Sequence, residues 1–126
     1  MFLIPTGTDA PVYHFPWGTI GIITVTTLVM LASAVGVLPP PDELAAVAGL
    51  QHGAGLHPLQ WLTSNFVHAG WSHLIGNMMF LWAFGLIVEG KVGWLRFSGI
   101  YLGLGGAECL LEQALLPGPG LSLGAS

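Results

Sequence analysis

Residues 71–89 read WSHLIGNMMFLWAFGLIVE. The run from Trp71 to Val88 contains no formally charged residue, and its eighteen residues approach the length at which a helix crosses the hydrocarbon core of a bilayer. His73 and Asn77 lie inside this run, four residues apart, and Glu89 closes it. A charged side chain costs roughly 2.5–3.5 kcal/mol at the centre of a membrane helix. Polar groups in such a run therefore indicate a functional site in the protein interior.

The composition identifies the class of protein. Of 126 residues, six are acidic, two are basic and 53% are apolar, with a mean hydropathy of +0.76. A soluble domain carries about 25% charged residues, so the chain is predicted to be an integral membrane protein that lies in a lipid bilayer. Lys91 and Arg96 alone cannot form a nucleic-acid-binding surface. The single cysteine, Cys109, excludes a disulfide within the chain.

The chain is predicted to be an all-α membrane protein. Three apolar segments have the length of transmembrane helices: residues 17–38, 70–89 and 94–116. Prolines 39–41 end the first, because proline cannot continue the helical hydrogen-bond ladder. Residues 42–56 are predicted to be a loop with at most one helical turn, and the proline-rich residues 1–16 an irregular tail. Apolar character resumes after the Pro-Gly-Pro-Gly turn at 117–120, so a fourth helix is expected to begin near residue 121.

The two basic residues predict the orientation of these helices. Lys91 and Arg96 lie at the connection between the second and third segments, and positive residues stay on the cytoplasmic side. The N-terminal tail is then cytoplasmic, and the chain is a multi-pass protein of the cell membrane. His73, Asn77 and Ser126 come to lie at a similar depth near the outer surface.

The pair formed by His73 and Asn77 has the chemistry of an oxyanion site. Residues four apart share one helix face, the asparagine amide and the imidazole both donate hydrogen bonds, and a developing oxyanion needs such donors. The alternative is that both hydrogen-bond to neighbouring helices, as polar residues in membrane interfaces do. Ser126 follows Gly124 and Ala125, and these small neighbours let a substrate approach its hydroxyl. Close helix packing explains the same small residues.

Other polar and small residues receive a structural interpretation. Gly85, Glu89 and Gly93 continue the register of His73 and Asn77 at four-residue spacing. The glycines are expected to let a neighbouring helix approach, and Glu89 to hydrogen-bond loop backbone.

Gly99 and Gly103 form a second small-residue face that is expected to pack against another helix. Glu108 and Glu112, one helical turn apart, are not explained by this pattern. With His73 they suggest a second class of function, a proton relay in a transporter.

A metal site is not predicted. Four of the five histidines lie close enough in the sequence to suggest a zinc site: His52, His57, His68 and His73. Their spacing fits no closed tetrahedral zinc site, and no cysteine joins them. We therefore expect no metal and no other cofactor, and the sequence does not indicate an oligomeric state.

Five motifs together resemble one family. They are His57-PLQWLTSNFV-His68, His73-x-x-x-Asn77, Gly85-x-x-x-Glu89-x-x-x-Gly93, Tyr101-Leu-x-x-Gly105 and Gly124-Ala-Ser126. In this order and at this spacing they resemble the rhomboid intramembrane serine proteases. The resemblance implies a bundle of six membrane helices, of which residues 17–126 form a part, and cleavage of transmembrane protein substrates. It also implies that Ser126 is the nucleophile, that His73 and Asn77 stabilise the oxyanion, and that Glu89 is structural.

Two departures from the family pattern limit what these residues can do. The first outer loop carries no arginine, and the family's general base, a histidine on the sixth helix, has no counterpart here. A serine without a base is a weak nucleophile. The 126 residues are therefore expected to be inert alone and to be a fragment of a longer protease. The alternative within the family is a non-catalytic, rhomboid-like protein that binds membrane clients.

Overall fold

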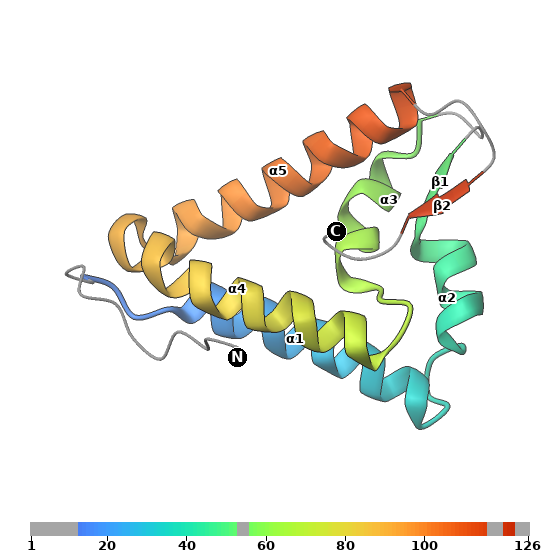
Figure 1. The fold of residues 1–126 in the computed structure, drawn as a ribbon, viewed down its shortest axis with the longest axis horizontal. Coiled ribbons are helices and arrows are strands. Elements are labelled where there is room, and N and C mark those ends of the chain that lie inside the picture. The colour runs from blue at the N-terminus through green and yellow to red at the C-terminus, as the bar shows by residue number, and fades with distance from the viewer. Residues whose placement is uncertain (1–12, 53–55, 116–119, 123–126) are drawn as a thin grey trace, which may run out of the picture.

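The computed structural model describes residues 13–52, 56–115 and 120–122. Its elements in chain order are α1 (Trp17–Ala34), α2 (Pro41–Ala48), β1 (Leu50–His52), α3 (Pro58–Thr63), the 3₁₀ helix η1 (Ser64–Phe66), α4 (Trp71–Val92), α5 (Trp94–Leu115) and β2 (Gly120–Ser122). The helices α1 and α4 run side by side, while α5 diverges from α4 after the turn that joins them (Figure 1). The shorter elements lie at the open end of this arrangement.

All three predicted long helices form. Within the described residues, α1 and α4 are long and apolar enough to cross a membrane, as expected for a membrane protein. Helix α5 has the predicted length but carries Arg96, Glu108 and Glu112, and it does not reach the same apolar character. That α5 also spans the membrane, and that the chain crosses it several times, stay predictions.

The first helix ends earlier than the prolines predicted. Helix α1 stops at Ala34, and Gly36 then adopts a left-handed conformation with φ of +77°. The N–H groups of Val37 and Leu38 donate to the Ala32 carbonyl, which satisfies the helix end. The glycine turn therefore ends α1, and the prolines come after it.

The segment predicted as a loop is more regular than expected. Pro41 occupies the first turn of α2, where its missing N–H costs no hydrogen bond, and Asp42 and Glu43 favour the same helix N-terminus. Strand β1 then pairs antiparallel with β2, with Leu50 opposite Ser122. Residues 120–122 are thus a strand where a fourth helix was expected to begin. Residues 123–126 lie outside the described part of the chain, so a later helix stays a prediction.

Glycines set the distances between the long helices. A Cβ added at Gly85 would overlap the Thr19 hydroxyl, so this glycine lets α4 approach α1, as predicted. Gly93 acts differently from the prediction, because its φ of +82° ends α4 in a conformation that favours glycine. Gly99 and Gly103 have no described atom within 4 Å of an added Cβ, so their predicted packing role finds no partner among the described residues. Beside the Gly85 crossing, the buried core brings together Ile22, Leu81 and Phe97.

Candidate active site

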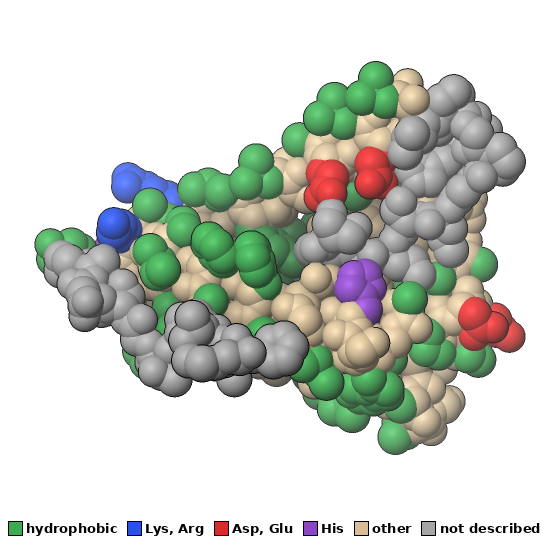
Figure 2. Space-filling view, in the orientation of Figure 1, with side chains coloured by type: hydrophobic (Ala, Val, Ile, Leu, Met, Phe, Trp, Pro, Cys, Tyr) green, Lys and Arg blue, Asp and Glu red, His purple; other side chains and the backbone are tan. Residues whose placement is uncertain are grey.

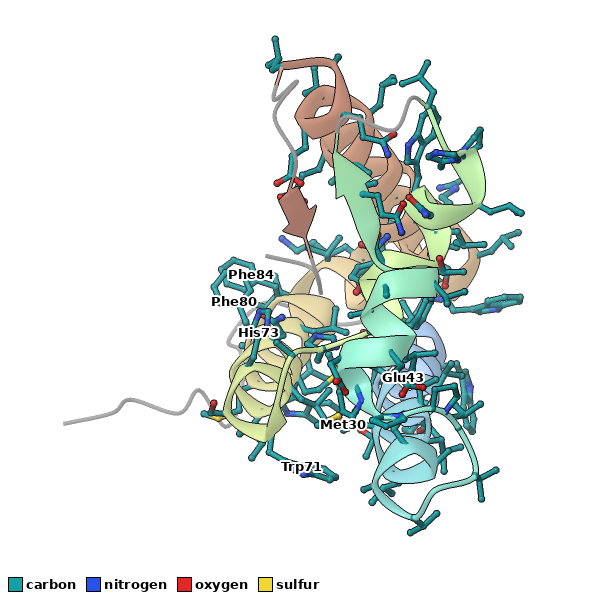
Figure 3. All side chains as sticks on the ribbon, turned by 90° about the vertical axis from the view of Figure 1, so that its right-hand side faces the viewer. Met30, Glu43, Trp71, His73, Phe80 and Phe84 are labelled. Atoms are coloured by element: carbon teal, nitrogen blue, oxygen red, sulfur yellow. The ribbon has the colours of Figure 1, made fainter. Side chains whose placement is uncertain are left out.

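The site lies where the chain enters α4. His73 stands in the first turn of that helix and Asn77 follows one turn later, and both side chains are half-buried. Figure 3 shows His73 on the same side of α4 as Phe80 and Phe84. Positions 73, 77, 80 and 84 recur at helical spacing, so the polar pair and two aromatic side chains form one continuous face.

His68 joins the two predicted donors. The Asn77 amide nitrogen Nδ2 donates to Nε2 of His68 over 3.0 Å. The imidazole rings of His68 and His73 meet edge-on, with centroids 5.2 Å apart. His68 itself is only 2% exposed. A buried imidazole that precedes the helix therefore holds both residues of the pair.

This role of His68 was not predicted from the sequence. A role was considered for His68 only as a zinc ligand, although it is the last residue of the 57–68 motif that resembles the rhomboid family. Its position five residues before His73 was the available signal. The helix begins between them, at Trp71, and a turn of chain that is not yet helical can fold back onto the face of α4.

The environment of His68 favours the neutral form of its ring. Burial is the main cause that lowers the pKa of His68, and a charge on His73 lowers it further, while the Phe66 carbonyl acts in the opposite direction. Because Nδ2 of Asn77 can only donate, Nε2 of His68 carries the lone pair and the ring proton resides on Nδ1. His68 is therefore an acceptor that fixes one N–H of Asn77.

Glu89 fixes α4 against the start of α1. Its two carboxylate oxygens accept the N–H of Gly18 (2.6 Å), the N–H of Thr19 (2.7 Å) and the Thr19 hydroxyl (2.7 Å). The side chain is completely buried. Backbone N–H groups at a helix start lack partners within the helix, and a carboxylate there also complements the helix dipole. Glu89 bonds a helix N-terminus instead of the loop backbone that was expected.

A second hydrogen-bonded cluster holds the segment before His68 against α5. The Trp61 indole donates to Oε1 of Gln113 over 2.7 Å, and Nε2 of Gln113 donates to the Gln51 carbonyl over 2.9 Å. Asn65 donates to the Trp61 carbonyl, and its amide fills the space that a Cβ at Gly105 would take. The chain around α3 and η1 thus reaches His68 in a fixed position.

An apolar groove runs from Asn77 along the divergent helices. Its volume is about 330 Å³, and α4 and α5 supply its walls, including Phe80, Phe84 and Tyr101. Figure 2 shows Lys and Arg side chains together at one end of the molecule. Asn77 lies near the start of α4 and Lys91 in its last turn, so the polar end of the groove is far from the basic α4–α5 turn.

Some predicted site residues cannot be placed. Ser126 and Gly124 lie outside the described residues, so the structure does not test their distance from Asn77. Within the described part of the chain, no group of three His, Cys, Asp or Glu side chains could hold a metal ion.

Comparison with known proteins identifies the family. The family model described as Rhomboid domain matches residues 55–126, more than half of the chain. The chain belongs to the rhomboid family. It is also 39% identical over 67 residues to Rhomboid-like protein 11, chloroplastic, of Arabidopsis thaliana. That match covers 53% of this chain but 24% of the relative, so the chain spans about a quarter of the relative's length. No solved structure matches the chain significantly.

Proposed function

We propose that the rhomboid protein containing these residues is an intramembrane serine endopeptidase that cleaves transmembrane proteins. The observation that carries the proposal is the hydrogen bond from Asn77 to His68 beside His73. An asparagine amide has two N–H groups, and His68 fixes one of them. The second N–H group is then already oriented before the reaction begins. An oxyanion site requires donors that are oriented in advance in this way.

The proposed reaction is acyl transfer. The Ser126 hydroxyl attacks the substrate carbonyl carbon, and a histidine from a longer chain takes the hydroxyl proton and returns it to the leaving amine. Asn77 and His73, with backbone N–H groups near the serine, stabilise the oxyanion. Water then hydrolyses the acyl-enzyme and regenerates Ser126. His68 accepts from Asn77 and so holds that donor, and it is not assigned the role of base.

The groove beside Asn77 supports a membrane-embedded substrate. Its walls are apolar, and Asn77 supplies a polar group to its lining. A transmembrane segment presents an apolar surface of this kind, and its backbone becomes accessible where its helix is locally unwound. The site is proposed to open toward the outer side of the membrane, with the N-terminus cytoplasmic.

A second function within the family is binding of membrane clients without cleavage. The exposed Phe80 and Phe84 rings, with centroids 4.3 Å apart, favour it because they offer a client helix an aromatic surface whether or not chemistry follows. On this alternative, His73 and Asn77 only hold helices together.

Labelling with a serine-directed fluorophosphonate separates the two functions. The full-length protein in detergent is expected to react at Ser126, Ser126→Ala to remove the label, and Ser122→Ala to keep it as a matched control four residues earlier. Labelling that persists in Ser126→Ala would remove this serine from its role. No labelling of the wild type, in a protein that still binds a transmembrane peptide, would establish the client-binding function instead.

A further inference from the structure

Two buried polar groups face one small cavity behind the candidate site. Ser33, in the last turn of α1, and His68 both line it, together with apolar side chains and Phe66. Ser33 is 8% exposed and His68 is 2% exposed. By hydrogen-bond geometry, neither Oγ of Ser33 nor Nδ1 of His68 has a partner among the described residues, although the Phe66 carbonyl is near enough to His68 to raise its pKa. Both atoms are therefore open to a further partner in the cavity.

The cavity has room for one water molecule. The space open to the centre of a water molecule is about 10 Å³, which is the lower limit for holding one. A buried water commonly makes about three hydrogen bonds to polar groups that otherwise lack partners. Here Nδ1 of His68 is available as a donor and Oγ of Ser33 as an acceptor, which gives such a water two polar partners.

We propose that a single buried water joins Ser33 Oγ to His68 Nδ1, and that Ser33 is thereby a positioning residue for the Asn77 donor. The consequence for catalysis rests on the proposed function. The water accepts a hydrogen bond from Nδ1–H and so holds His68 in the tautomer whose Nε2 accepts from Asn77. In the opposite tautomer Nε2 would carry the proton and face an N–H of Asn77. The amide would then have to turn, and its second N–H would leave the direction of the oxyanion.

The tautomer of His68 is a direct readout of this arrangement. The ¹⁵N chemical shifts of ¹⁵N-histidine in the full-length protein distinguish the two tautomers, and His68→Gln assigns the signal. The wild type is expected to show His68 protonated at Nδ1. Ser33→Ala removes one partner of the water, and the ratio of the Nδ1 to the Nε2 tautomer is expected to fall by about five- to tenfold, the effect of one hydrogen bond.

Thr26→Val is the matched control. Thr26 is a second buried hydroxyl on α1, but its Oγ1 donates to the Ile22 carbonyl of the same helix. Its removal is expected to leave the His68 signal unchanged. A tautomer ratio in Ser33→Ala equal to the wild type would overturn the proposal, as would a wild-type ring protonated at Nε2.

Activity tests the catalytic consequence separately. If the protein is a protease, Ser33→Ala is expected to lower kcat by a similar factor with KM unchanged, and Thr26→Val to change neither. A tautomer shift without an effect on kcat would keep the water and reject its catalytic role. A tautomer shift in a protein that does not cleave at all would keep the positioning of Asn77 and reject the protease function.

Discussion

Replacement of Glu89 by glutamine tests how α1 and α4 are joined. The amide keeps the shape of the side chain but exchanges one acceptor oxygen for an NH2 group. One oxygen of Glu89 accepts from the Gly18 N–H and the other from the Thr19 N–H and hydroxyl. Whichever oxygen is exchanged, a buried backbone N–H therefore loses its acceptor.

The magnitude follows from these three bonds. A buried donor left without a partner costs about 1–3 kcal/mol. The bonds that survive also lose the assistance of the negative charge, which makes such bonds roughly twice as strong as neutral ones. Glu89→Gln is expected to lower the free energy of unfolding by about 2–4 kcal/mol.

Unfolding of the full-length protein by SDS in mixed micelles measures this loss. Glu43→Gln is the matched control, because Glu43 lies exposed in the first turn of α2 (labelled in Figure 3). Its contribution to the helix dipole is at most about 1 kcal/mol. Equal free energies of unfolding for Glu89→Gln and Glu43→Gln would refute the account of how α1 is held.

Three further predictions concern packing, pH and orientation. Gly85→Ala is expected to lower the free energy of unfolding by about 1–3 kcal/mol, because the new Cβ would overlap Thr19. Gly99→Ala is the control and is expected to leave this free energy unchanged, because no described atom lies within 4 Å of its Cβ. Equal free energies of unfolding in SDS for the two variants would contradict the prediction. Burial and a charge on His73 lower the pKa of His68 below 6.5, so the unfolded chain binds more protons and stability falls as pH drops below that value. His68→Gln should flatten this part of the profile of unfolding against pH, and an identical profile would count against a buried neutral ring. Arg96→Cys is expected to react with an impermeant maleimide added from the cytoplasmic side. Labelling from the outside would contradict the predicted orientation.

Helices α1 and α4 could be predicted because an uncharged apolar run of about eighteen to twenty residues has few alternatives to a membrane helix. The starts of α4 and α5 lie within a residue of the predicted starts. The sequence could not predict β1 and β2, because each has three residues and the strands pair across about seventy intervening positions. No local sequence pattern predicts such a contact.

The candidate site was predictable only in part. The spacing of His73 and Asn77 shows a shared helix face, since helical geometry is local. His68 reaches that face through a turn that is not helical and there accepts from Asn77. Glu89 accepts from the N–H of Gly18, which lies 71 residues away along the chain. Both contacts depend on tertiary structure. Ser126 lies outside the described residues, so its role stays a prediction.

The central claim is that Asn77 is an oxyanion donor held by His68. Cleavage of a transmembrane substrate by the full-length protein in proteoliposomes tests it most directly, with Ser126→Ala as the inactive reference. Asn77→Ala is expected to lower kcat by about a hundredfold with KM little changed, the loss typical of one oxyanion donor. An unchanged kcat in a folded Asn77→Ala protein would contradict the claim and leave Asn77 as a residue that only holds helices together.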